Sequence, residues 1–183
     1  MKKRSLFLTA IILITALLLS GCHQATLEDF KLFRSSPLGF SIEYPDFWQK
    51  EADVSEGIAV FVTPAEGYSD EYHESFSVQR FTPDMEGENV FNEYVQGYVG
   101  NLESTLKNYK LVSQDEIKFG GEDAYQIVYE STSDDGESQL RVLQIFAQKG
   151  DKMYVASYMA DFSSYSYFLT DVEKMISTFQ FIG

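Results

Sequence analysis

The chain offers few side chains that could act as a nucleophile or a base. It has one cysteine, Cys22, and two histidines, His23 and His73. Catalysis by a serine, threonine or cysteine nucleophile needs a base within reach, and histidine is the commonest choice. His73 lies between two predicted strands with no catalytic motif around it. We therefore expect a protein that is not an enzyme, and an envelope hydrolase built on His73 is a weaker alternative.

The loop around His73 is the strongest candidate for a metal site. Its sequence, GYSDEYHESF, contains Asp70, Glu71, His73 and Glu74. Carboxylate and imidazole groups together can bind a divalent cation. A solvated acidic loop explains the same residues in a chain that carries 28 acidic side chains. We expect no cofactor, and a divalent cation held by these four residues is the alternative.

Cys22 follows a segment with the order of a secretory signal. Lys2, Lys3 and Arg4 come first, and an uncharged apolar run extends from Leu6 to Leu19. A transmembrane helix needs about 20 such residues, so this run is short for a membrane span. The four residues LSGC (19–22) then resemble the lipobox of bacterial lipoprotein signal peptides. The resemblance implies cleavage between Gly21 and Cys22 and a lipid on the Cys22 thiol.

This resemblance predicts the location of the protein. Residues 1–21 are the expected signal peptide, and residues 22–36 are the expected lipidated tether. Two acyl chains give a firm anchor, where one is marginal. We expect the protein on a cell membrane, facing outside the cytoplasm. An outer membrane is the alternative if the cell has two, because His23 rather than an aspartate follows Cys22. A plain anchor helix with an unmodified cysteine is the competing interpretation.

The chain after the predicted signal peptide is strongly acidic. The formal charge of −14 becomes −17 when the three cations of residues 1–21 are removed. Nucleic acid and anionic lipid repel such a surface, so we expect no nucleic-acid partner and attachment through the lipid alone. Residues 22–183 suit one domain, and the aromatic content of 15% indicates a packed core rather than disorder.

Period-two alternation and short apolar runs predict strands in most of the chain after residue 37. Steps of three and four predict one helix from Asn89, the expected N-cap, to Leu106 and another from Phe168 to Phe179. Adjacent hairpin strands favour antiparallel pairing, so we predict an α+β fold with one antiparallel sheet of about six to eight strands, flanked by two amphipathic helices. The predicted strands are 40–44, 58–62 (buried on both faces), 75–81, 111–119, 124–130, 140–148, 153–159 and 179–182.

Two glycines interrupt the first predicted helix. Gly97 and Gly100 each cost about 1 kcal/mol relative to alanine inside a helix. We expect them to let the helix pack closely on the sheet, and a backbone opening for a ligand is the alternative.

Aromatic residues crowd the last predicted strand and helix. We expect Trp48 to be a packing anchor. Most of Tyr154, Tyr158, Tyr165 and Tyr167 are expected in the core, and an exposed aromatic patch for a partner is the alternative.

Three stretches carry a resemblance that covers residues 37–183. They are GFSIEYPDFWQKE (39–51), GGEDAYQIVYE (120–130), and QIFAQKGDKMYVASYMA followed by YFLTDVEKMISTFQF (144–181). These stretches resemble the PsbP-like proteins, a group that includes the Mog-type Ran-binding proteins. The resemblance implies an α/β/α sandwich and a binding role without catalysis, toward a protein or another envelope component. No position matches the functional residues of either subgroup, so the resemblance assigns no partner-binding residue.

Overall fold

The computed structural model describes residues 29–65, 73–85 and 87–182. It has ten strands and two helices within these ranges, and the order along the chain is the predicted one with additions. The strands are β1 (Phe30–Ser35), β2 (Phe40–Pro45), β3 (Gln49–Asp53), β4 (Ile58–Val62), β5 (Ser75–Phe81), β6 (Lys107–Phe119), β7 (Glu122–Thr132), β8 (Gln139–Lys149), β9 (Lys152–Asp161) and β10 (Gln180–Phe181). The helices are α1 (Val90–Thr105) and α2 (Tyr165–Thr178).

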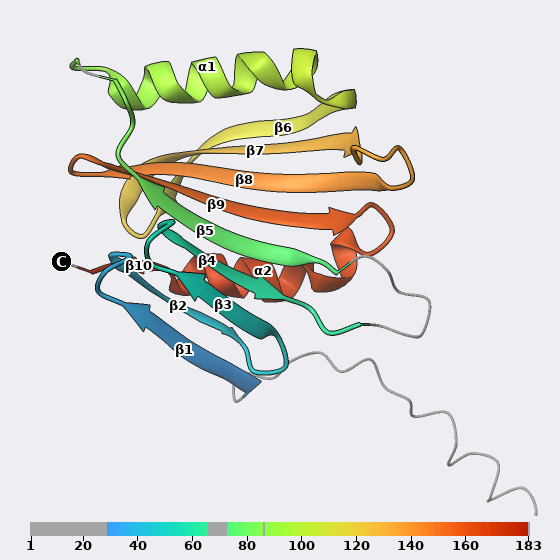
Figure 1. Cartoon of the computed structure of the whole chain (residues 1–183), viewed down its shortest axis with the longest axis horizontal. Helices are drawn as coiled ribbons and strands as arrows, with labels where there is room; N and C mark the ends of the chain where they lie inside the picture. Colours follow the sequence, from blue (N-terminus) through green and yellow to red (C-terminus); the bar gives the residue numbers. More distant parts are fainter. Residues whose placement is uncertain (1–28, 66–72, 86, 183) are drawn as a thin grey trace, which may run out of the picture.

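A seven-stranded antiparallel sheet forms the middle layer of the fold (Figure 1). Its strand order is β3-β4-β5-β9-β8-β7-β6. Helix α1 covers one face, while α2 and a small sheet of order β1-β2-β10 cover the other face. The predicted α+β fold with two flanking helices is confirmed, and the small second sheet is an addition to it.

The larger of two apolar cores lies between the sheet and α2. Phe179, directly after α2, stacks on Phe119 with ring centroids 4.0 Å apart and on Phe40 at 5.3 Å. Trp48 is 3% exposed and meets the Phe168 ring edge-on, so its expected packing role is confirmed. Three of the four crowded tyrosines, Tyr154, Tyr158 and Tyr165, are buried as expected, whereas Tyr167 is exposed.

The smaller core lies between the sheet and α1. Val95 and Leu102 of the helix are buried against Ile127, Val142 and Phe146 of the sheet. Tyr98 adds its ring to this layer at 5.0 Å from the Phe146 ring. Asn89 occupies the N-cap position of α1 as predicted, but its side chain makes no capping hydrogen bond. Packing on the sheet therefore fixes α1 more than its cap does.

Part of the expected tether belongs to the folded domain. Residues 22–36 were predicted as a tether, yet Phe30–Ser35 form β1 and pair antiparallel with β2. Phe33 is 8% exposed, and its ring lies 5.5 Å from that of Phe40. Phe30 and Phe33 are three residues apart and Leu32 is exposed, so the alternation that would have revealed the strand is missing.

Strand β3 was also missed, because it has no apolar pattern. All five of its residues are exposed, and backbone pairing with β4 holds it at the edge of the large sheet. The neighbouring strand β4 buries Ala59 and Phe61, whereas its other three residues are half-buried. The prediction that this strand is buried on both faces is therefore wrong.

Gly120 and Gly121 form the hairpin turn that joins β6 to β7. Both glycines have left-handed backbone conformations, with φ of +58° and +90°. A Cβ atom at Gly120 would lie 2.8 Å from the Phe181 ring, so this turn is also closely packed on β10. No helix among the described residues is long and apolar enough to span a membrane.

Candidate functional site in a cleft between helix α1 and the β6–β7 hairpin

The chain brings α1 and β6 side by side through a very short connection. Only Leu106 separates them, and its backbone N–H donates to the Leu102 carbonyl at 2.9 Å. Lys107 then pairs with Thr132 at the far end of β7. Because the chain reverses at this junction, the N-terminal part of α1 lies beside the tip of the β6–β7 hairpin (Figure 1).

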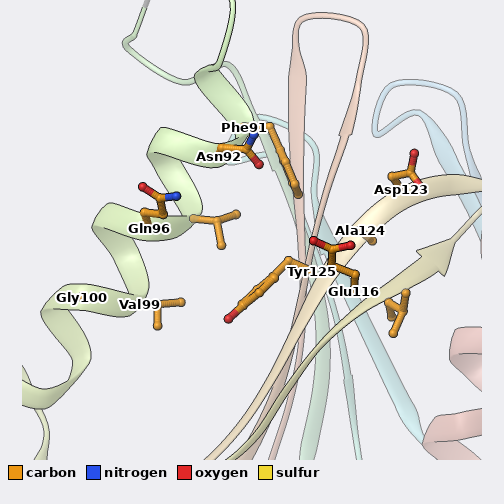
Figure 2. A pocket seen from close by; sticks show the side chains of 11 residues that line it. Phe91, Asn92, Gln96, Val99, Gly100, Glu116, Asp123, Ala124 and Tyr125 are labelled. Atoms are coloured by element: carbon orange, nitrogen blue, oxygen red, sulfur yellow. The ribbon is translucent and has the colours of Figure 1, made fainter.

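A cleft of about 660 Å³ opens between these elements. This volume falls in the range of small-molecule and peptide-side-chain pockets. Figure 2 shows Phe91 and Tyr125 projecting from the helix and the strand into the space between them. The residues that line the cleft are Phe91, Asn92, Val95, Gln96, Val99, Gly100, Glu116, Ile117, Asp123, Ala124 and Tyr125.

The lining combines an apolar interior with an acidic and amide-bearing rim. Phe91, Val95 and Val99 repeat at steps of four on α1 and line the cleft. Figure 2 shows Phe91 and Val99 on the helix side and the Tyr125 ring on the strand side. The polar members are Asn92, Gln96, Glu116 and Asp123, and the lining includes no lysine, arginine or histidine. Such a surface favours an occupant with an apolar body and a positively charged or hydrogen-bond-donating part.

The two carboxylates of the rim differ in their surroundings. Asp123 lies 2.6 Å from the Lys118 ammonium, in a pair whose members are both largely exposed. Glu116 is exposed, and it forms no ion pair with any other residue that the structure describes. An exposed ion pair contributes little, so Lys118 neutralises the rim only weakly and Glu116 keeps its charge available.

Gly100 leaves part of the cleft open. A Cβ atom at Gly100 or at Gly97 would meet no atom within 4 Å. The expectation that these glycines allow close packing on the sheet is therefore wrong. The rings of Tyr94 and Tyr98 stand between α1 and Phe146 and hold the helix backbone away from the strands. At Gly100 the alternative, a backbone opening next to a site, fits the geometry.

A buried polar network fixes the middle of α1 on the sheet. The Gln144 amide nitrogen donates to the Tyr98 hydroxyl at 3.0 Å and to the Ser157 hydroxyl at 3.1 Å. The Tyr129 hydroxyl donates to the Gln144 amide oxygen at 3.4 Å. Burial raises the pKa of Tyr129 well above its ordinary value, so the phenol stays a donor even in alkaline solution. A satisfied network of this kind rigidifies the layer and keeps the cleft preformed.

Tyr125 is held in place on the opposite wall. Its hydroxyl donates to the Gln114 amide oxygen at 2.8 Å. Burial and the nearby Asp115 charge both raise the pKa of Tyr125 above its ordinary value, which keeps the hydroxyl protonated and able to donate. The lining has no serine, cysteine or histidine, so it lacks the pair that serine and cysteine hydrolases use. An apolar interior with a few polar groups at the rim is the usual composition of a binding pocket.

The residues singled out from the sequence lie elsewhere. Gly21, Cys22, Asp70 and Glu71 are outside the described residues. Glu74 is 2% exposed, and its carboxylate accepts a hydrogen bond from the Thr63 hydroxyl at 3.1 Å.

His73, next to Glu74, is exposed, and its Nδ1 lies 3.1 Å from the Thr63 carbonyl oxygen. Among the described residues no three His, Cys, Asp or Glu side chains are grouped to hold a metal ion.

The sequence carried only a weak signal for the cleft. The apolar face of α1 is wider than the part that covers the sheet. Its additional apolar residues are Phe91 and Val99. The strand-borne members, such as Glu116 and Asp123, look like ordinary solvent-facing residues of a hairpin. Only the tertiary structure brings Glu116 and Asp123 close to α1.

The overall fold is similar to that of solved structures at low sequence identity. LpqN of Mycobacterium tuberculosis, involved in cell envelope biogenesis, matches with a TM-score of 0.59 at 12% identity, over 79% of this chain and 83% of that one. Cyanobacterial PsbP from Synechocystis matches with a TM-score of 0.55 at 15% identity, over 89% and 98%. The Ran-binding protein Mog1p of Saccharomyces cerevisiae matches with a TM-score of 0.54 at 12% identity, over 84% and 95%. At these sequence identities the comparison shows a shared fold.

The family of the chain is shown by sequence. No curated protein matches it. The sequence model for PsbP-like protein matches residues 22–181, which is nearly all of the chain that follows the predicted signal peptide. The expected resemblance is thereby confirmed, and the chain belongs to the family of PsbP-like proteins.

Proposed function

We propose that this protein is a lipid-anchored, non-catalytic binding protein that holds a protein or another envelope component in the α1–β6/β7 cleft, outside the cytoplasm. The observation that carries the proposal is the cleft itself. It has an apolar interior, a polar rim and a volume of about 660 Å³, and its lining contains no serine, cysteine or histidine. The Gln144 network supports it further, because a preformed site loses less entropy on binding than one that must be ordered.

The anchor part of the proposal rests on residues 1–22. The basic start, the apolar run and the LSGC sequence support lipidation at Cys22. A charge of −17 after residue 21 gives the domain no attraction of its own to anionic lipid, so a covalent lipid supplies the membrane attachment. The likeness to LpqN, which is involved in cell envelope biogenesis, is in keeping with an envelope role.

Replacing Cys22 with alanine tests the anchor. We expect unprocessed precursor to accumulate, because the lipid acceptor is absent, and metabolic labelling with a tagged palmitate analogue to fall to background. Gel mobility and the label in the membrane fraction are the measurements. A Ser20→Ala variant, which keeps a small residue before the cleavage point, is the control and should be processed normally. Normal processing and labelling of Cys22→Ala would refute lipidation.

Filling the cleft tests the binding site. Gly100 lines the cleft, and a Cβ atom there would meet only open space, so a Gly100→Trp variant places an indole in the cleft. We expect the amount of partner recovered from membranes with this variant to fall about tenfold, the effect of losing roughly 1.4 kcal/mol of binding free energy. Quantitative mass spectrometry of the recovered material is the measurement.

Gly97→Trp is the matched control for this experiment. Gly97 lies on the same helix with equally open space, but it does not line the cleft. It should recover the partner as the unaltered protein does. Equal recovery by all three proteins would contradict the assignment of the cleft.

A further inference from the structure

Strand β6 presents a free edge next to the cleft. It is the last strand of the large sheet, and among the described residues only β7 pairs with it (Figure 1). Its ladder with β7 has irregularities between Lys107 and Lys110 and between Leu111 and Ser113. From Ser113 to Phe119 the pairing is regular. Bulges protect the first half of an edge strand from further pairing, and the second half lacks this protection.

The hairpin geometry tells which backbone groups of this edge face outward. Phe119 and Glu122 close a two-residue turn, so they form a hydrogen-bonded pair. Hydrogen-bonded pairs then alternate along the ladder, which directs the backbone groups of Gln114, Glu116 and Lys118 away from β7. Glu116 also lines the cleft. Free backbone donors and acceptors therefore adjoin an apolar pocket.

The charges beside this edge favour a basic occupant. Asp115 and Glu116 lie on the edge and Asp123 lies across from it, with Lys118 as the one cation of the regular half. Neither Asp115 nor Glu116 has an ion-pair partner among the described residues. A second copy of this chain would bring another acidic edge and a like net charge, so charge complementarity disfavours self-pairing.

We propose that the occupant is an extended polypeptide segment of a basic partner, which pairs with residues 113–119 as an eighth strand. Alternate side chains of such a segment point to one face, so an apolar residue enters the cleft between Phe91, Val99 and Tyr125. A lysine or arginine of the segment then faces Glu116. Strand addition of this kind takes affinity from the backbone and specificity from side-chain pockets. The inference rests on the proposed function, and it adds the chemical class of the partner.

Selection from a random library supplies the probe. The full chain, expressed and processed in bacteria, is immobilised and panned with a phage-displayed library of unconstrained linear dodecapeptides, and binders to the Gly100→Trp variant are discarded. We expect the enriched peptides to alternate apolar and polar residues and to carry at least one lysine or arginine. The dissociation constant of the best synthetic peptide is then measured by fluorescence anisotropy.

Variants of the edge test the backbone pairing. Lys118→Pro removes an outward N–H at an edge position where proline is tolerated, and Lys118→Ala is its control for the lost charge. We expect Lys118→Pro to lower the affinity for the peptide about tenfold, the effect of losing one or two hydrogen bonds. Lys118→Ala should change this affinity less than twofold. Glu116→Lys should lower the affinity for a basic peptide about tenfold as well. It should not lower the affinity for a variant of that peptide in which glutamate replaces the basic residue.

Modified peptides keep the test independent of protein folding. N-methylation at alternate positions of the peptide should abolish binding in one register and leave it intact in the other, because only one set of N–H groups faces β6. No enrichment over the naive library would overturn the inference. Binding that is indifferent to Lys118→Pro and to N-methylation in both registers would also overturn it. In that case the cleft would bind through side chains alone, and the proposed function would stand.

Discussion

Replacing Phe179 with alanine should lower the free energy of unfolding by about 3–5 kcal/mol, the usual range for a phenylalanine removed from a core. Phe179 is 3% exposed and follows the last turn of α2. Its ring stacks on Phe119 at 4.0 Å and on Phe40 at 5.3 Å, and meets Phe181 edge-on at 5.0 Å. The residue therefore joins β6, β2 and β10, and its loss leaves a cavity where the two sheets and α2 meet.

Urea unfolding followed by circular dichroism measures this change. Tyr167→Ala is the control, because Tyr167 lies in α2, has a comparable ring and is 56% exposed. That variant should lose less than about 1 kcal/mol, as for an exposed aromatic contact. A Phe179→Ala variant as stable as Tyr167→Ala would show that the core between α2 and the sheets is arranged differently.

Replacing Gly57 with alanine should cost roughly 3 kcal/mol or more, because backbone strain and a steric clash act together. Gly57 has φ of +70° in the turn between β3 and β4. A Cβ atom there would lie 2.2 Å from the Arg80 carbonyl oxygen, which is backbone and cannot move aside. The Arg80 N–H also donates to the Gly57 carbonyl at 2.7 Å, so a displaced turn loses this hydrogen bond as well.

Gly121→Ala separates the clash from the strain. Gly121 has φ of +90° but no atom within 4 Å of a Cβ position. We expect this variant to cost about 1–2 kcal/mol, the strain of one left-handed residue. The two melting temperatures and unfolding free energies are compared side by side. Equal losses would mean that the β3–β4 turn does not press against β5 as described.

The element order was predictable because the main strands either bury alternate residues, as β4 and β5 do, or form long apolar runs, as β8 and β9 do. Strand 75–81 and helix 89–106 agree with β5 and α1 within a residue, since Phe76 and Val78 alternate and the α1 pattern repeats at helical steps. The missed strands carry no such pattern. All of β3 is exposed, so only its pairing with β4 defines it as a strand. Strand β1 combines a buried Phe33 with an exposed Leu32, and only its pairing with β2 defines it. The division into two sheets follows from this pairing.

The cleft was less predictable than the fold. The sequence indicates a possible backbone opening at Gly100. Whether Gly100 lines one cleft with Glu116 and Tyr125 depends on the distance between α1 and the sheet. That separation is set by the rings of Tyr94 and Tyr98, and the hydrogen bond from Gln144 to Tyr98 fixes it. A sequence pattern assigns these residues to a helix face and to a strand without indicating their contact. Local periodicity predicts which face is apolar, and tertiary packing decides which part of that face stays uncovered.

Photo-crosslinking from the rim of the cleft tests the binding claim most directly. The photoreactive residue p-benzoylphenylalanine is placed in living cells at Asn92, which lines the cleft, or at Asn101, an exposed asparagine of the same helix outside it. If the partner binds in the cleft, position 92 gives a discrete crosslinked partner that is lost on adding Gly100→Trp, and position 101 gives no such product. Equal products from both positions, or none from position 92 under any growth condition, would contradict binding in the cleft.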